Sequence, residues 1–319
     1  MTNRRAVLRQ SAALALIALA CAPGAAQEPP EPGAPQPSAA GKSHDKLPPA
    51  LAVGRIAYED SGVIKVIDLA ADATTSFDLP ERMEQPAWNP DGKRFTYSSS
   101  FGVSILDIPN QSFMSASQPG RPAGRPSWSG DGTRLVYEVQ GDEPRLETFD
   151  TRDKARRTLA LPLRASQPAW HPKLDRLAFV AAVDGVDQVF VVDAPCLADA
   201  TCDKPQKALA PTQVTKGGKS NREPAWSPDG TRLAFERDAG DGQGTGIFVV
   251  PAAGGEPKRL SPAGSDDHAP AWGSNDALAF QRGSGEKTSV CVMKADGSGA
   301  LTVVKDTGRS PSWWQPAQP

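Results

Sequence analysis

The sequence of 319 residues has only three histidines, four cysteines and three tyrosines, and almost no excess of one charge. Its 35 basic and 37 acidic side chains give a net charge of −2. It therefore lacks the basic excess that neutralises a run of phosphates, and we expect no nucleic-acid partner. Long Leu-rich or Ala/Glu/Lys-rich stretches are absent after residue 50, which argues against a helical fold. The 31 prolines and 29 glycines favour strands joined by turns.

The first 26 residues have the pattern of an export signal. Arg4, Arg5 and Arg9 precede an apolar run over 12–20, and small residues follow at 22–26. The run is too short to span a bilayer. The pair of arginines resembles a twin-arginine signal, whose receptor passes folded cargo, but the general secretory route accounts for the pattern equally well.

Cys21 ends a stretch that resembles a bacterial lipobox, Ala18-Leu19-Ala20-Cys21, although Ala18 stands where that motif usually has leucine. Cleavage before Cys21 would make it the lipid-carrying N-terminal residue. We prefer this to ordinary cleavage near Ala26, because an acyl chain and a flexible arm together make a tether. Residues 27–50 form that arm, since they are rich in Pro, Ala and Gly and too poor in bulky apolar groups to fold. We expect a disordered linker there.

A four-residue motif ending in tryptophan recurs along the rest of the chain. Proline and then Ala or Ser precede each Trp, and six of the seven tryptophans belong to a copy. The copies are QPAW at 85–88, RPSW at 125–128, QPAW at 167–170, EPAW at 223–226, APAW at 269–272 and SPSW at 310–313.

Each copy except the last is followed by a turn and by further strand-like stretches. The turn is best preserved as NPDG at 89–92 and SPDG at 227–230, where Pro presets φ and Gly accepts a positive φ, and such chemistry closes a hairpin. A stretch with an aromatic at a fixed place follows, as at 232–235, and then one that is apolar on both faces, as at 247–250. A strand apolar on both faces must be covered on both, as the stacked blades of a propeller are. A weaker fourth strand completes each unit.

The tryptophans of the motif are spaced by 40, 42, 56, 46 and 41 residues, which is the period of four-stranded propeller blades. The two ends complement each other, because 55–58 is an aromatic strand without a Trp strand before it and 310–313 is a Trp strand without an aromatic strand after it. We therefore predict one domain over 51–319. Its expected fold is an all-β, six-bladed β-propeller of four-stranded antiparallel blades, closed by pairing the C-terminal strand with the N-terminal blade.

The segment PAWSPDGTRLAF at 224–235 resembles the repeat of TolB-like propellers, the WD40-like (PD40) repeat proteins of the bacterial envelope. The resemblance covers 51–319 and implies the propeller fold. It implies less about function, since propellers of this kind occur in binding proteins, peptidases and lyases. The sequence shows neither the α/β domain that precedes the propeller in TolB nor the Gly-x-Ser-x-Gly turn of propeller peptidases. TolB's place in the Tol-Pal complex therefore does not carry over, and we expect no peptidase activity.

The resemblance places a candidate site at the funnel face of the propeller, which is lined in this fold by the residues just before each innermost strand. The side chains there are charged groups and amides: Glu84, Gln85, Arg125, Gln167, Arg222, Glu223, His268 and Arg309. Such a ring suits a polar partner, a peptide segment or a carbohydrate, through charge-assisted hydrogen bonds. The alternative is a solvated rim without a ligand.

The other candidates are two cysteines and one acidic cluster. Cys196 and Cys202 share a polar loop of an exported protein, so we predict a disulfide, against two free thiols or a weak metal pair. Asp266, Asp267 and His268 offer carboxylate and imidazole ligands to a divalent cation, but three consecutive residues rarely converge on one ion. We therefore expect no metal, no cofactor and no catalytic residue.

These observations predict a non-catalytic propeller of the cell envelope that serves as a protein-binding scaffold. We expect a monomer that faces the periplasm, touches a membrane only through Cys21, and binds a protein or another envelope component. The rival hypothesis is a carbohydrate-active lyase or hydrolase with a metal or paired carboxylates on the axis. An assembly factor of an outer-membrane machine shares every sequence feature with the first hypothesis.

The mass of the mature protein separates the two processing hypotheses. We expect a chain that begins at Cys21 and carries the added mass of acyl chains, and that leaves the membrane fraction when Cys21→Ser removes the acylation site. Intact-mass spectrometry of the protein from its host measures this directly. A mature chain that begins near Gln27 without added mass would contradict acylation.

Overall fold

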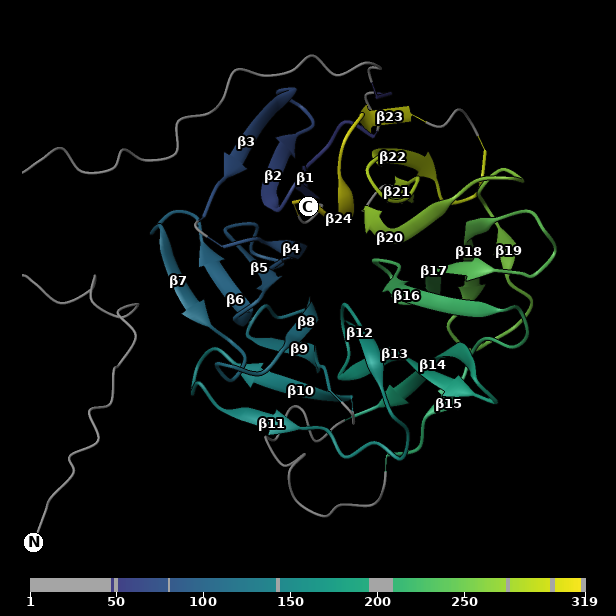
Figure 1. Cartoon of the computed structure of the whole chain (residues 1–319), viewed down its shortest axis with the longest axis horizontal. Coiled ribbons are helices and arrows are strands. Elements are labelled where there is room, and N and C mark those ends of the chain that lie inside the picture. The colour runs from purple at the N-terminus through teal and green to yellow at the C-terminus, as the bar shows by residue number, and fades with distance from the viewer. Residues whose placement is uncertain are drawn as a thin grey trace, which may run out of the picture. The chain divides into compact units, whose positions relative to one another are not determined.

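The computed structural model of the chain describes residues 47–48, 51–79, 81–141, 144–194, 209–273, 276–298 and 302–316. Within these ranges it contains twenty-four β-strands, and they form six four-stranded antiparallel sheets around a central axis (Figure 1). The predicted all-β, six-bladed propeller is confirmed. No helix in the described part of the chain is long and apolar enough to cross a membrane.

The six sheets are named blades A to F in chain order, and each is given from its innermost strand outward. Blade A contains β24 (Arg309–Trp314), β1 (Arg55–Asp60), β2 (Val63–Asp68) and β3 (Ala73–Phe77). Blade B contains β4 (Glu84–Trp88), β5 (Arg94–Ser99), β6 (Gly102–Asp107) and β7 (Ser112–Ser115). Blade C contains β8 (Ala123–Trp128), β9 (Arg134–Val139), β10 (Arg145–Asp150) and β11 (Arg156–Thr158).

Blades D to F repeat the same order. Blade D contains β12 (Ser166–Trp170), β13 (Arg176–Val183), β14 (Val186–Asp193) and β15 (Thr212–Gln213). Blade E contains β16 (Ser220–Trp226), β17 (Arg232–Asp238), β18 (Thr245–Pro251) and β19 (Lys258–Arg259). Blade F contains β20 (Asp267–Gly273), β21 (Ala277–Arg282), β22 (Ser289–Lys294) and β23 (Thr302–Lys305).

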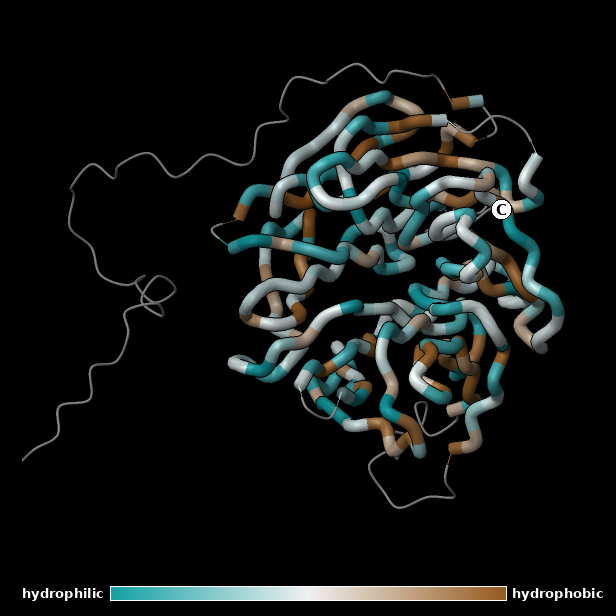
Figure 2. The backbone as a smooth tube through the Cα atoms, turned by 45° about the vertical axis from the view of Figure 1, so that its right-hand side comes forward, coloured by the Kyte–Doolittle hydropathy of each residue, from teal (hydrophilic) through white to brown (hydrophobic). Residues whose placement is uncertain are grey.

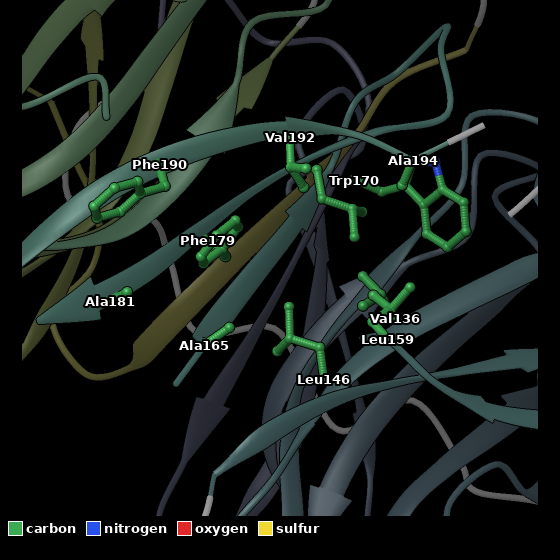
Figure 3. Close-up of a cluster of buried hydrophobic side chains, with 11 residues drawn as sticks. Val136, Leu146, Leu159, Ala165, Trp170, Phe179, Ala181, Phe190, Val192 and Ala194 are labelled. Carbon is green, nitrogen blue, oxygen red and sulfur yellow. The ribbon is translucent and has the colours of Figure 1, made fainter. Parts of the chain in front are cut away.

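The hydrophobic core lies between the blades. Six clusters of buried side chains occur in the described residues, and each joins two neighbouring blades. Between blades C and D, Val136 and Leu146 face Trp170 and Phe179 (Figure 3). Apolar and polar stretches alternate along the chain (Figure 2). A single blade therefore leaves apolar surface on both faces and is covered only by its neighbours.

The repeated tryptophan ties each blade to the one before it. Trp128 Nε1–H donates to the carbonyl of Ala87 in the preceding blade at 3.2 Å, and Trp226 of blade E and Trp272 of blade F make the same bond to Ala169 and Ala225. An arginine at the start of the preceding blade's second strand covers the indole. Arg94 lies 5.5 Å from the Trp128 ring centre, and the same contact is made by Arg55 over Trp88, Arg134 over Trp170 and Arg232 over Trp272.

In blades B, C and E an aspartate fixes the turn after the tryptophan strand. In blade E, Asp229 accepts hydrogen bonds from Ser227 Oγ and from the Thr231 N–H at 3.0 Å, and these bonds lower the pKa of Asp229 to about 2. Blade D lacks this aspartate. There the His171 Nδ1 atom accepts from the N–H groups of Lys173 and Leu174, both at 3.0 Å, so an imidazole replaces the carboxylate in a remodelled turn.

The ring closes in blade A, where β24 from the end of the described chain pairs with β1 from its start (Figure 1). Ile56 lies opposite Trp313 in this pair. Trp314 then reaches over the first turn of blade B, where its Nε1–H donates to the Pro90 carbonyl at 3.0 Å. Gly92 has a φ of 65°, and a Cβ there would lie 2.2 Å from the Trp314 ring, so only glycine fits beneath it.

Four predictions from the sequence concern residues outside the described ranges. These are the export signal over 1–26, the lipidation of Cys21, the linker over 27–50 apart from Leu47 and Pro48, and the disulfide between Cys196 and Cys202. They stay predictions.

Removal of residues 309–319 tests the closure of the ring. We expect the melting temperature to fall by about 10 °C or more, because blade A loses its innermost strand and the Trp313 cluster is opened. Thermal unfolding followed by far-ultraviolet circular dichroism measures the loss, and a peptide of residues 309–316 added to the shortened chain should restore part of it. An unchanged melting temperature would contradict closure by β24.

Candidate functional site

The innermost strand of every blade contains a bulge at the residue before its repeated proline. The bulged residue adopts a left-handed backbone in all six strands: Gln85 (φ 51°), Arg125 (52°), Gln167 (51°), Glu223 (51°), Ala269 (48°) and Ser310 (46°). Residues other than glycine rarely adopt this conformation, which costs ~1–3 kcal/mol at each site. The following proline has no N–H, so the bulge leaves no donor unpaired at that position.

These left-handed residues and the neighbouring prolines line a narrow cavity on the axis, with a volume of ≈ 120 Å³. Four predicted funnel residues belong to the lining: Gln85, Arg125, Gln167 and Glu223. The other four each stand one position earlier, outside that lining: Glu84, Arg222, His268 and Arg309. Ala269 and Ser310 complete the lining at the same repeat position, and their small side chains had given no sign of a site.

The N–H of a left-handed residue donates to a side chain of the preceding blade. In three junctions the acceptor follows the aromatic of the second strand: Glu138 Oε2 accepts from Gln167 at 3.0 Å, Glu236 Oε2 from Ala269 at 3.4 Å and Gln281 Oε1 from Ser310 at 3.4 Å. Sequence reasoning missed these acceptors, although their recurrence after the aromatic was a signal for them. Glu59 holds the same place in blade A, where it is buried and accepts from the Gly62 N–H at 2.7 Å.

In blades B and D the residue after the aromatic of the second strand is Ser98 or Val180. There a glutamine of the innermost strand is the hydrogen-bond acceptor instead. Gln85 Oε1 accepts from the Arg125 N–H at 2.9 Å and from Ser98 Oγ at 2.8 Å. Gln167 Oε1 accepts from the Glu223 N–H at 2.8 Å. Both glutamines were predicted as funnel residues, and in the structure their side-chain oxygens join one blade to the next.

An ion pair crosses the axial cavity. Arg125 Nη1 of blade C contacts Glu223 Oε1 of blade E, and Arg125 Nε lies 3.7 Å from Glu138 Oε2. Burial lowers the pKa of Arg125, while Glu138 and Glu236 act in the opposite direction. The floor of the funnel is therefore a paired, partly buried charge network.

Residues 99–317 match the family model of the TolB beta propeller domain, PD40. The chain belongs to the TolB β-propeller family. Comparison with curated protein sequences gave no match.

Solved structures resemble this TolB-family propeller in fold. TolB from Acinetobacter baumannii is 17% identical, with a TM-score of 0.66 over 83% of this chain and 67% of that one. A putative TolB from Agrobacterium tumefaciens is 18% identical, with a TM-score of 0.62 over 81% of this chain and 91% of that one. An oligogalacturonate lyase in complex with manganese is 15% identical, with a TM-score of 0.52 over 76% and 70% of the two chains. Identities this low show the fold alone.

In this TolB-family propeller His268 bridges two carboxylates. Its Nδ1 lies 3.1 Å from Glu236 Oε2 in blade E, and its Nε2 lies 2.8 Å from Asp266 Oδ1. The hydrogen bond to Glu236 is the main reason that the pKa of His268 is raised, to about 9. The imidazole is therefore positively charged at neutral pH.

The three residues considered for a metal do not converge. Asp267 is fully buried and faces away from His268, because its two carboxylate oxygens pair with Arg282 Nε at 2.7 Å and Nη2 at 2.9 Å. Asp266 and His268 lie together and engage each other. Within the described ranges no group of three or more His, Cys, Asp or Glu side chains is arranged to hold a metal ion.

The outer rim of the funnel carries charges that are accessible to solvent. Glu84, Arg222 and Arg309 have side chains 51%, 48% and 41% exposed. Arg222 pairs with Asp187 at 2.5 Å, and Arg309 lies 3.9 Å from Glu59. These pairs are partly open to water and therefore weak, so the rim is able to exchange them for contacts with a partner.

His268→Gln tests the imidazolium bridge. The raised pKa means that the stability contributed by His268 is present in full below pH 6.5 and is lost as the pH rises through about 9. We expect a loss on the order of 2 kcal/mol at pH 6 and little loss at pH 10. Urea unfolding of both proteins at pH 6, 8 and 10 measures the difference. An equal loss at all three pH values would contradict a charged His268.

Proposed function

We propose that this protein is a non-catalytic propeller of the cell envelope that binds a segment of another protein at the funnel face. The observation that supports the proposal is the rigid, charge-paired floor of the funnel beneath a rim of exposed charges. A partner that approaches such a floor meets groups already held in place, which lowers the entropy lost on binding.

The chemistry of the rim favours a polar polypeptide. Exposed groups of both signs, Glu84 together with Arg222 and Arg309, offer charge-assisted hydrogen bonds to carboxylates, ammonium groups and backbone amides. Charges of both signs on one rim also select a partner by complementarity.

Catalysis receives less support, because the acidic groups around the axis already have partners. Glu138 and Glu236 accept from backbone N–H groups of the next blade, and Glu223 pairs with Arg125. A lyase or hydrolase would need a carboxylate or imidazole poised towards a substrate. We therefore propose binding rather than turnover, with no cofactor.

The location is part of the same proposal. Membership of the TolB β-propeller family and the signal-like pattern over 1–26 support an envelope protein that faces the periplasm. Cys21, if acylated, would anchor it to a membrane, and the residues up to 50 would give the propeller reach. We propose that it acts there as a monomer.

Site-specific photo-crosslinking in the host cell tests the proposal. A benzophenone side chain at position 222 or 309 should capture a defined protein, and the same group at Lys258, on the outer edge strand β19, should not. Arg309→Glu should reduce capture from position 222, because it reverses one charge of the rim. Capture of the same abundant proteins from all three positions would contradict binding at the funnel face.

A further inference from the structure

The aromatic residue of each second strand has an opposite neighbour on the third strand, and this neighbour differs between blades. In blades D and E it is phenylalanine. Phe179 stacks on Phe190 with ring centres 5.8 Å apart, and Phe235 stacks on Phe248 at 6.1 Å. In blade B the corresponding Tyr97 faces Ser104, which in turn faces Ser115 of β7. Two small side chains therefore lie where blades D and E have larger ones, Phe190 and Gln213 or Phe248 and Arg259.

A groove of ≈ 850 Å³ lies over these two serines. One wall is the connection from β3 to β4, with Leu79 and Glu81, and the other is the outer part of blade B, with Phe101 and Phe113. Phe101 is 67% exposed and Phe113 is 52% exposed. Of the three large hydrophobic side chains exposed in the described residues, two thus line this one groove. Exposed apolar groups gathered in this way mark an interaction surface.

The wall between β3 and β4 carries a carboxylate that has no cationic partner among the described residues. Glu81 Oε1 accepts from the Tyr97 hydroxyl at 2.8 Å, and Glu81 Oε2 accepts from Ser99 Oγ at 3.0 Å. No ion pair of Glu81 occurs with any Lys, Arg or His of the described residues. The adjacent Arg82 is directed elsewhere, since its guanidinium lies 3.0 Å from Glu84 and 3.5 Å from Glu59.

Blade C also pairs a tyrosine with a carboxylate, which there belongs to the third strand, and its cation is in place. Tyr137, the repeat equivalent of Tyr97, donates to Glu147 Oε2 at 3.2 Å, and Arg145 Nη2 pairs with Glu147 Oε1 at 2.8 Å. Arginines also cover outer aromatic rings in blades C and E, where Arg156 lies 5.2 Å from the Phe149 ring centre and Arg259 lies 5.5 Å from that of Phe248. Within the described residues no arginine or lysine lies over Phe101 or Phe113. Among the described residues, blade B therefore lacks the cation that blades C and E supply from their own sequence.

We propose that the groove between blades A and B binds an extended basic segment of a partner protein, whose arginine pairs with Glu81 and covers the exposed phenylalanines. An apolar side chain of the same segment fills the space above Ser104 and Ser115. The carboxylate of Glu81, which has no ion pair among the described residues, selects a cation. The strand β7 has β6 as its one neighbour in the sheet and so presents an outer edge to a polypeptide, although its Ser115 carbonyl already accepts from Arg156 Nη2 at 3.0 Å. This surface is separate from the funnel and does not depend on the function proposed for it.

Binding of a labelled peptide to the full mature chain tests the proposal. The probe is a short fluorescein-labelled peptide of alternating arginine and leucine, measured by fluorescence anisotropy at physiological salt against the same peptide with glutamate in place of arginine. We expect the arginine peptide alone to bind. Glu81→Gln and Phe113→Ala should each weaken its binding roughly tenfold, because each removes one of the groups that hold the guanidinium.

Ser104→Phe is the decisive variant, because it gives blade B the residue that blades D and E have. We expect it to fold with an unchanged or higher melting temperature, since the introduced ring would stack on Tyr97 as Phe190 does on Phe179, and to abolish peptide binding by filling the space. Matched controls are Leu174→Ala, the third exposed apolar side chain, and Glu256→Gln on blade E, both of which should bind as the unchanged protein does.

Three results would overturn the proposal. The first is equal binding of the arginine and glutamate peptides. The second is binding by Ser104→Phe or Glu81→Gln, each checked for its native circular-dichroism spectrum, at the strength of the unchanged protein. The third is a dimer in light scattering that dissociates in Phe101→Ala and Phe113→Ala, which would show that a second copy of the chain occupies the groove.

Discussion

The burial of apolar surface between blades is the constraint on which the rest of the structure depends. The third strand of a blade is buried on both faces, as the buried residues 189–192 of β14 and 247–250 of β18 show. Since a four-stranded sheet has only one partner on each side, the apolar faces are all covered only when the chain of blades returns on itself. The pairing of β24 with β1 is thus a condition for burying the clusters on both sides of blade A.

Closure also explains why strain is tolerated on the axis. Six residues other than glycine adopt left-handed backbones in the innermost strands. At five junctions between blades the N–H of such a residue donates to the blade before it. A hydrogen bond of this kind contributes about 1 kcal/mol net, whereas an unpaired buried donor costs ~1–3 kcal/mol. The strained bulges are therefore held by contacts that exist only in the assembled ring, and they give the funnel a floor that does not rearrange easily.

The sequence predicted the blades well because their signals are local and repeated. The Pro-Ala-Trp motif, the Asp-Gly turn and the aromatic strand each follow from short-range chemistry, and their spacing gave both the number of blades and the way the ring closes. The predicted funnel residues were drawn from the right segment of each blade. Their individual roles could not be predicted, because alternation along a regular strand does not reveal a bulge. The bulge turns Gln85 into the axial cavity and leaves Glu84 outside its lining.

The sequence also did not reveal where one residue takes over the hydrogen-bonding role of another at a distant position. Gln85 and Gln167 accept the inter-blade hydrogen bond where the second strand has Ser98 and Val180 in place of the acceptor. In the turn that has Lys173 in place of the aspartate, His171 Nδ1 is the acceptor. Each such replacement is compensated by another residue of the same chain. Ser104 is a different case. Its position varies between the blades, and no other side chain among the described residues fills the space above Ser104 or forms an ion pair with Glu81. A replacement that another residue of the chain compensates preserves the fold. A space or charge that no other residue compensates adds a surface that the fold does not require. Blade B is therefore the part of this propeller where we infer that the repeat has been altered for a partner.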